Sequence, residues 1–364
     1  MMKQTASDKI RTTENTKHLI CVNASRNYNI EIEKGSLETI GKKVKELFPK
    51  SKVAIITDDI VNGFYSGIVE KSLTSENIDF CKFVFENGEG SKTLVTCEKI
   101  FDFLTENMIT RSDIIIALGG GVVGDTAGFV AASYLRGIEF IQIPTTFLAS
   151  IDSSVGGKTG VNTALGKNLV GSFWQPSLVI IDTNTFDTLP ENIFADGVSE
   201  AIKYGVIKNN QLFEIIKSGK IKENLETVIK ECILIKKQLV EQDERDTGDR
   251  MLLNFGHTIG HAIEKHSNHK ISHGSGVAIG MVMMSNLSES LGLTNKGTAK
   301  EIENVCKTYN LPTDYNGKEK ELVQIIKSDK KRKGENITIV LAKEIGTSFL
   351  YKISIDDFEK CFVK

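Results

Sequence analysis

The chain has 364 residues and carries 45 basic against 47 acidic side chains, a formal net charge of −2 at pH 7. This near balance argues against a general nucleic-acid binder and against a polybasic membrane-surface protein, so any anion-binding site must be local. At about 100 to 200 residues per domain, the length predicts two domains.

Residues 1–17 are polar and mixed in charge, which predicts a flexible extension rather than a signal peptide or a transmembrane helix. No later stretch reaches the roughly 18 unbroken apolar residues of a membrane span. The six cysteines lie far apart and form no C-x-x-C pair. Reduced thiols are therefore expected, and with them a cytoplasmic location.

From His18 to about Asp182, short apolar runs alternate with helical patterns, which predicts an α/β domain with a largely parallel sheet. Ser36 to Phe48 and Cys97 to Asn107 repeat apolar residues at three- and four-residue spacing, as crossover helices do. The expected strands are Leu19 to Val22, Tyr28 to Ile32, Lys52 to Thr57, Phe80 to Phe85, Asp113 to Leu118, Glu139 to Ile143 and Leu178 to Ile181.

The pattern changes after Pro190, where long helical stretches predict a second, mainly α-helical domain. Ile337 to Leu341 is the one segment of this part that reads as a strand. The basic run at residues 327–333 is interpreted as a solvated loop. The expected helices include Leu212 to Lys217, Leu225 to Glu241 and Val277 to Leu291.

The first chemical signal is the segment Asp113 to Asp125, DIIIALGGGVVGD, in which a strand runs into glycines. Glycines there let backbone N–H groups approach a phosphate, and the following helix offers its positive end to the same anion. The segment matches G-x-G-x-x-G but does not follow the first strand, and Glu139 is a poor match for the expected ribose-binding acid. A tight turn against a sheet is the alternative.

The second signal is the histidines, five of which fall between His257 and His273. A helix over Phe255 to Glu264 would place His257 and His261 on one face, and His273 follows a short connection. With a carboxylate, such residues suit zinc or cobalt, although spacing leaves open which histidines bind. The alternative is a surface helix with hydrated histidines, and His266 and His269 are assigned to it.

The third signal is a set of cations and amides beside glycines. Each charged hydrogen bond to an anion contributes about 1.5 to 3 kcal/mol, so several converging groups could hold a phosphate and a carboxylate. The candidates are Arg136, Lys158, Lys167, Asn168, Lys203, Arg250 and Asn254.

Together these segments resemble the motif series of the 3-dehydroquinate synthase family, in order, from about Leu19 to the C-terminus. The resemblance implies an N-terminal Rossmann-like NAD-binding domain over residues 18–185, a helical metal- and substrate-binding domain over 186–364, and an active site between them. The motifs that carry it are GGGVVGD, RGIEFIQIPTTFLASIDSSVGGKTGVN, GKNLVGSFWQP, EAIKYG, DERDTGDRMLLNFGHTIGHAIE and HGSGVAIGM.

The resemblance also implies the reaction. The substrate would be 3-deoxy-D-arabino-heptulosonate 7-phosphate, which the family converts to 3-dehydroquinate and phosphate in the shikimate pathway of aromatic amino acid biosynthesis. NAD would be reduced and regenerated within one turnover, and a divalent metal, zinc or cobalt, would act as Lewis acid and template. His261 and Lys203 are candidates for proton handling, with the leaving phosphate as the alternative acceptor.

Site residues follow from the resemblance position by position. The metal ligands would be Glu200, His257 and His273. Arg136 matches a residue that reaches the substrate of the neighbouring subunit, which implies a homodimer. The NAD contacts would be Asp58, Glu89, Lys92, Gly121, Val122, Val123, Gly124, Asp125, Thr145, Thr146, Lys158, Lys167, Thr185, Phe186, Asp187 and Thr188. The substrate contacts would be Asp152, Lys158, Lys167, Asn168, Lys203, Lys236, Arg250, Asn254, His261 and one of Lys330 and Lys331.

The sequence departs from the family's common residues at four of these motif positions. Ser275 and Gly276 stand in place of Glu-Ala, Ser150 in place of glutamine, and Ile60 in place of asparagine. Three other readings compete: another sugar-phosphate cyclase, such as one of the 2-deoxy-scyllo-inosose synthase type, a metal-dependent polyol dehydrogenase, and a metal-stabilised module without activity.

Overall fold

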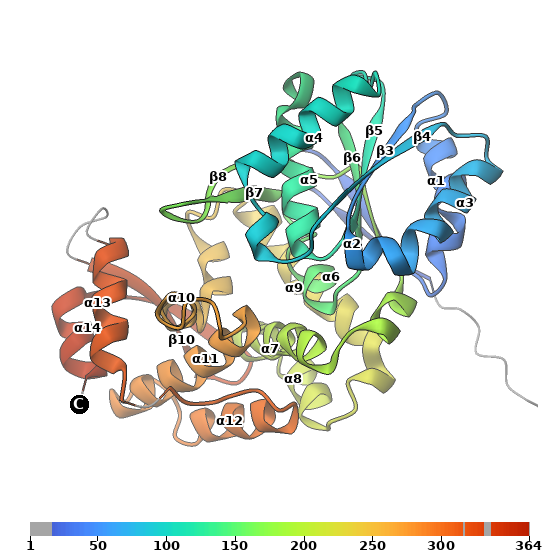
Figure 1. The fold of residues 1–364 in the computed structure, drawn as a ribbon. Helices are drawn as coiled ribbons and strands as arrows, with labels where there is room; N and C mark the ends of the chain where they lie inside the picture. The colour runs from blue at the N-terminus through green and yellow to red at the C-terminus, as the bar shows by residue number, and fades with distance from the viewer. Residues whose placement is uncertain (1–16, 316, 331–335, 364) are drawn as a thin grey trace, which may run out of the picture.

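A seven-stranded sheet with helices on both faces forms the first half of the computed structural model, and helices dominate from α7 onward (Figure 1). The structure describes residues 17–315, 317–330 and 336–363. The expected fold class, a mostly parallel α/β part followed by a mainly α-helical part, is confirmed.

The sheet has the strand order β1-β2-β9-β6-β5-β3-β4, and its strands are parallel except β1, which pairs antiparallel with β2. All seven strands were expected from the sequence, with ends no more than one residue from those observed. Their bounds are β1 His18–Val22, β2 Tyr28–Ile32, β3 Val53–Asp58, β4 Phe80–Phe85, β5 Ile114–Gly119, β6 Glu139–Pro144 and β9 Leu178–Ile181.

The helices cover the sheet and then continue as a separate group. Those of the first half are α1 Ile40–Leu47, α2 Asp59–Val61, α3 Gly67–Ser75, α4 Leu94–Glu106, α5 Gly121–Ser133 and α6 Phe147–Ile151. Those of the second half are α7 Glu191–Lys208, α8 Asn210–Lys217, α9 Leu225–Gln242, α10 His257–His266, α11 His273–Ser290, α12 Thr298–Thr308, α13 Glu319–Lys330 and α14 Ile355–Phe362.

The sheet is buried on both faces, as the continuous apolar runs of its central strands require. Every residue of β3 and β5 is buried. Helices α1 and α3 pack on one face, and α4 and α5 pack on the other. A third apolar core joins β1, β2 and β9 to the helices after Pro190, so the two parts are packed together.

The strand order reverses between β3 and β5, because the chain moves outward from β3 to β4 but inward from β5 to β6. In open parallel sheets, ligands bind at the carboxyl ends of the strands beside such a reversal. Asp58 ends β3 and Gly119 ends β5. The glycine-rich segment therefore lies where this topology favours a ligand.

Two β-hairpins add strands that were not expected: β7 (Lys158–Thr163) with β8 (Gly166–Phe173), and β10 (Asn336–Glu344) with β11 (Thr347–Ser354). The expected strand Ile337 to Leu341 lies within β10, and β11 is the additional strand of that hairpin. The expectation of a single strand in the helical part was therefore wrong. The first hairpin was missed because KTGVNT and GKNLVGSF contain glycine and lack apolar–polar alternation.

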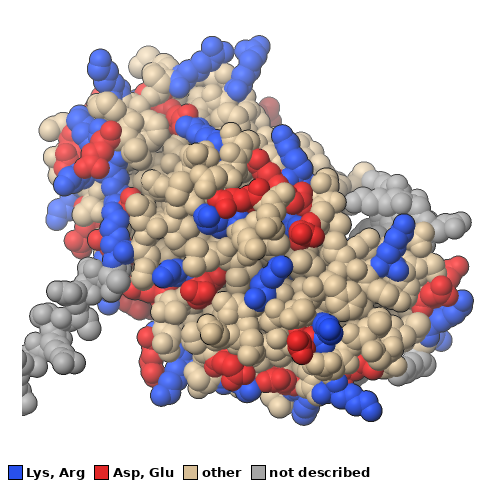
Figure 2. Space-filling view, turned by 180° about the vertical axis from the view of Figure 1, so that it is seen from behind, with Lys and Arg blue, Asp and Glu red and all other residues tan. Residues whose placement is uncertain are grey.

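The surface agrees with the near-neutral composition. On the face shown in Figure 2, basic and acidic side chains are interspersed rather than segregated by sign. None of the helices in the described part of the chain combines the length and apolar character that crossing a bilayer requires. All six cysteines are unpaired.

Candidate metal and substrate site

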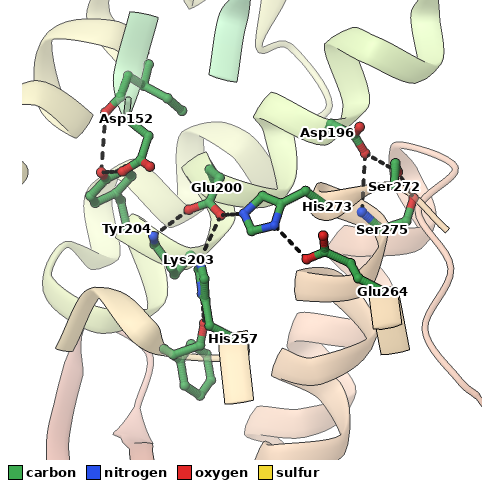
Figure 3. A network of polar contacts seen from close by, with 12 residues as sticks. Asp152, Asp196, Glu200, Lys203, Tyr204, His257, Glu264, Ser272, His273 and Ser275 are labelled. Atoms are coloured by element: carbon green, nitrogen blue, oxygen red, sulfur yellow. Dashed lines mark hydrogen bonds and ion pairs between the residues drawn. The ribbon is translucent and has the colours of Figure 1, made fainter. Parts of the chain in front are cut away.

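Three side chains from three different helices converge in the second half of the molecule (Figure 3). Glu200 comes from α7, His257 begins α10 and His273 begins α11. The Oε1 atom of Glu200 lies 3.4 Å from Nε2 of His257 and 3.4 Å from Nε2 of His273. The structure thus brings together the three residues expected as metal ligands.

Glycines allow these helices to approach closely. A Cβ atom on Gly280 would lie 2.0 Å from the backbone oxygen of Gly256, and one on Gly276 would lie 3.0 Å from that of Gly260. A Cβ atom on Gly274 would lie 2.3 Å from Cα of Asp196 on α7. Helix α11 is therefore in backbone contact with both α10 and α7, and Gly276, one of the departures from the family pattern, fits that packing.

The spacing of the three candidate ligands fits a bound metal. Two ligands that are each about 2.0 to 2.2 Å from a tetrahedral zinc ion lie about 3.3 to 3.6 Å apart. The 3.4 Å separations from Glu200 fall in this range. Oε1 of Glu200 is also buried and accepts no hydrogen bond from a described residue. A carboxylate and two imidazoles are suitable donors for zinc or cobalt.

Hydrogen bonds orient both imidazoles toward Glu200. Nδ1 of His257 lies 3.1 Å from the carbonyl oxygen of Phe255, and Nδ1 of His273 lies 2.8 Å from Oε1 of Glu264. Since a carbonyl and a carboxylate only accept, each Nδ1 carries the hydrogen, and each Nε2 faces the Glu200 carboxylate.

Sequence reasoning missed Glu264. It lies three residues after His261 and seven after His257 on the helix α10, so a helical projection places all three on similar faces. The family resemblance assigned no role to Glu264.

The buried charges of this cluster are balanced. Lys203 forms an ion pair with Oε2 of Glu200, and both side chains are almost fully buried. Burial alone would raise the pKa of Glu200, but Lys203 and His257 outweigh it and hold that pKa well below its usual value. Burial opposes the charged form of His273, but the neighbouring carboxylates of Glu200 and Glu264 outweigh it and raise the pKa of His273 to about 10.

A second polar group adjoins the first. Nζ of Lys236 lies 2.7 Å from Oδ1 of Asp152 and 2.5 Å from its backbone oxygen, and the hydroxyl of Tyr204 donates to the same carboxylate at 2.7 Å. Burial lowers the pKa of Lys236 to about 8, although the Asp152 carboxylate opposes the shift. Two of the expected substrate contacts are thus paired with each other.

The structure places His261 beside the metal cluster but outside the Glu200 contacts. Its ring centroid lies 5.3 Å from that of His257 and 5.7 Å from that of His273, and its side chain is exposed. Of the two histidines assigned to hydrated surface, His269 is exposed. The assignment of His266 was wrong, because its Nδ1 lies 2.7 Å from the hydroxyl of Tyr315.

Three other expected substrate contacts differ in their burial and in their partners. Arg250 is buried, and its guanidinium donates to the backbone oxygens of Glu244 at 2.5 Å and Gly156 at 3.1 Å. Lys158 is half-exposed and forms an ion pair with Asp246. Asn254 is exposed at the end of a short helical turn, η7 (Asp249–Asn254).

Three of the remaining substrate candidates lie in a turn, near the start of a strand and at the end of a helix. Arg136 is exposed in a turn where both it and Leu135 have positive φ angles. Asn168 also has a positive φ, of 52°, near the start of β8. Lys330 ends α13, and Lys331 lies outside the described residues.

Many of the residues expected to contact NAD lie at the carboxyl edge of the sheet. Gly121, Val122, Val123, Gly124 and Asp125 form the first turn and a half of α5, directly after β5. Thr145 and Thr146 follow β6, and Asp58 caps α2 by accepting from the backbone nitrogen of Val61 at 2.8 Å.

Charged residues beside this edge are paired. The buried ammonium of Lys92 lies 2.6 Å from Oδ2 of Asp125. Glu89 is exposed and accepts from the Asn162 side chain of the β7–β8 hairpin at 2.7 Å.

Of the four expected NAD contacts that follow β9, two are buried and two are exposed. Thr185 and Phe186 are buried, with Phe186 against Phe147, whereas Asp187 and Thr188 are exposed. Of the other departures from the family pattern, Ile60 is 53% exposed in α2, and the hydroxyl of Ser150 donates to the backbone oxygen of Thr146 at 2.9 Å.

Models of one known family match this chain from residue 82 to residue 332. A model described as "3-dehydroquinate synthase N-terminal" matches residues 82–196, and one described as "3-dehydroquinate synthase C-terminal" matches residues 197–332. The 3-dehydroquinate synthase of Streptococcus mutans is 46% identical over 93% of this chain and 97% of its own, and that of Clostridium acetobutylicum is 47% identical over 90% and 93%.

A solved structure shares the fold. The 2-deoxy-scyllo-inosose synthase complexed with carbaglucose-6-phosphate, NAD+ and Co2+ superposes with a TM-score of 0.85 at 25% identity, covering 95% of this chain and 99% of its own.

Proposed function

The chain belongs to the 3-dehydroquinate synthase family, and we propose how its own residues perform the reaction. The reaction is a carbon–oxygen lyase reaction that depends on NAD and a divalent metal. The substrate is 3-deoxy-D-arabino-heptulosonate 7-phosphate, and the products are 3-dehydroquinate and phosphate. The observation that carries the proposal is the convergence of Glu200, His257 and His273 at ligand spacing.

Glu200, His257 and His273 would hold zinc or cobalt, which supplies Lewis-acid polarisation of the substrate hydroxyls. The bonds from His257 to Phe255 and from His273 to Glu264 fix the rings for that task. Lys203 balances the carboxylate of Glu200 and lies between it and Asp152, where it can donate to a substrate hydroxyl.

NAD, when bound at the sheet edge, would supply a reversible hydride acceptor for the substrate. The backbone of Gly121 to Asp125 would hold its phosphates at the N-terminus of α5, with Thr145 and Thr146 alongside. Asp58, at the end of the neighbouring β3, suits the ribose hydroxyls on the other side of the strand reversal.

The substrate's two anionic ends would use different cations. Lys236 would bind the carboxylate or a ring hydroxyl, exchanging part of its contact with Asp152. Lys158 and Arg250 would bind the phosphate together with Asn254, which requires the guanidinium of Arg250 to leave its backbone acceptors. Such orientation of one substrate through several steps can contribute about 7 to 11 kcal/mol.

His261 would serve as the proton acceptor facing the substrate, since its ring is exposed beside the two metal-binding rings. The leaving phosphate is the alternative acceptor. A His261→Ala variant that keeps near-full turnover would favour the phosphate.

We also propose a homodimer in which Arg136 of one subunit reaches the substrate of the other, and a cytoplasmic location. The exposed turn at Arg136 supports the first, and the unpaired cysteines support the second. The division into domains is proposed near residue 185, in the connection between β9 and α7.

The curated relatives support this substrate over that of another cyclase. They are 46% and 47% identical, against 25% for the inosose synthase. The test is to remove metal with a chelator, add back zinc or cobalt, and follow 3-dehydroquinate formation. We expect activity to depend on added metal and catalytic NAD. Formation of 3-dehydroquinate by the metal-free protein would contradict the metal assignment, and no product from the reconstituted protein would contradict the substrate.

A further inference from the structure

His273 lies between two buried carboxylates that contact opposite sides of its ring (Figure 3). Its Nε2 lies 3.4 Å from Glu200, which is the spacing of two ligands around an ion. Its Nδ1 lies 2.8 Å from Oε1 of Glu264, which is a hydrogen-bond distance. The two carboxylates therefore act differently on the same ring.

The second oxygen of Glu264 is also occupied. Nζ of Lys167 lies 2.7 Å from Oε2, and the Glu264 side chain is 4% exposed. Lys167 belongs to β8 of the hairpin, whereas Glu264 belongs to α10. This single carboxylate thus joins the hairpin to a metal-ligand candidate on α11.

A second metal site at His261, Glu264 and His273 explains these contacts less well. Their ligand atoms are within 4.8 Å of one another, but the 2.8 Å contact is shorter than the ligand separation around a tetrahedral ion. The ammonium of Lys167 would also repel a cation held by the same carboxylate.

We propose that Glu264 is a positioning residue for the metal centre: it holds the His273 ring so that Nε2 points to the ion, and it ties Lys167 to the same ring. This inference rests on the proposed metal site. It assigns a role to a residue for which the motif resemblance gave none. Partners of this kind typically change metal affinity by about 10- to 100-fold when they are removed.

The test is the metal affinity of Glu264→Gln, measured by competition with a chromophoric chelator for zinc and by the visible spectrum of the cobalt-loaded protein. We expect the dissociation constant to rise by about 10- to 100-fold and the cobalt absorption bands to shift, because the ring is oriented less firmly. The matched control is Glu303→Gln, which removes a glutamate paired with lysines on α12 and should leave both readouts unchanged.

Lys167→Met separates the two contacts of Glu264. It removes the ammonium but keeps the bond to His273, so metal affinity should change by less than about fivefold, the effect of a partly exposed ion pair. An equal loss in Lys167→Met and Glu264→Gln would contradict the orienting role, because it would trace the effect to the contact between Lys167 and Glu264 rather than to the bond with His273.

Glu264→Asp covers the case in which the glutamine variant does not fold. It keeps the charge but is shorter by one methylene, so it should also weaken metal binding. Wild-type affinity and an unchanged cobalt spectrum in a folded Glu264 variant would overturn the inference. Failure of the wild-type protein to bind metal would instead overturn the proposed metal site on which the inference rests.

Discussion

The two parts of the site are built by different means. At the sheet edge, the groups proposed to hold the NAD phosphates are the backbone N–H groups of Gly121 to Asp125. Cβ atoms on Gly121 and Gly124 would lie 3.2 Å and 3.0 Å from neighbouring side chains, so added volume there would crowd the segment. In the helical part, charged side chains form the site, and Glu200, Lys203 and Lys236 are all nearly fully buried.

This difference predicts how each part responds to substitution. Buried charges persist only when they are paired, so removing one leaves its partner uncompensated. Backbone sites respond instead to added volume. Charge changes should therefore disrupt the helical part, and small additions of side-chain volume should disrupt the sheet edge.

The largest effect is expected at the metal-ligand candidates. Glu200→Ala and His257→Ala should each lower kcat/KM by about 10³-fold, since losing about 4 kcal/mol of Lewis-acid stabilisation has that effect. Metal content per chain, measured by atomic emission, should fall in parallel. Full metal content together with activity within tenfold of wild type would show that these residues are not ligands.

At the sheet edge, Gly121→Val should weaken NAD binding by about 10- to 100-fold, because displacing one charged hydrogen bond costs about 1.5 to 3 kcal/mol. A Cβ atom there would lie 3.2 Å from Oγ of Ser153, so the added groups crowd the start of α5. The measurement is NAD titration by calorimetry. Gly67→Ala, where nothing lies within 4 Å of the new Cβ atom, is the control. Equal NAD affinity in the two variants would show that added volume does not disrupt the sheet edge, and would contradict the proposed difference between the sheet edge and the helical part.

A smaller effect is expected from pH. The pKa of Lys236 lies near 8 in the folded protein, below its ordinary value of 10.5, so its charge is present at neutral pH and lost as pH rises through about 8. If Lys236 binds the substrate anion, kcat/KM should decline there by up to tenfold per pH unit. The measurement is a pH profile of wild type and Lys236→Met. The variant should have lower activity and lack this decline, and an unchanged alkaline limb in the variant would assign the titration to another group.

The sequence predicts the sheet edge well because both of its signals are local. Apolar runs such as IIIALG predict the strands, and the glycines that follow predict the turn into α5. The missed β7–β8 hairpin has no such signal, because its strands are short of apolar residues and rich in glycine.

The metal cluster is predicted less completely, because it depends on contacts between distant segments. Helical spacing alone leaves open which histidines bind, whereas the structure brings His257 and His273 together at Glu200. The reason is the glycine contacts that bring α11 against α10 and α7, which no single-helix pattern contains. The family resemblance named the three residues that the structure brings together, but the contacts of Glu264 emerged only from the folded chain.

The most direct test of the account follows phosphate release and NADH absorbance in one reaction. Purified protein with bound metal would receive 3-deoxy-D-arabino-heptulosonate 7-phosphate and NAD in an amount well below the substrate. The account predicts that phosphate release continues far beyond the amount of NAD while NADH does not accumulate. Phosphate release that stops when the NAD is consumed, with matching accumulation of NADH, would contradict the internal redox cycle.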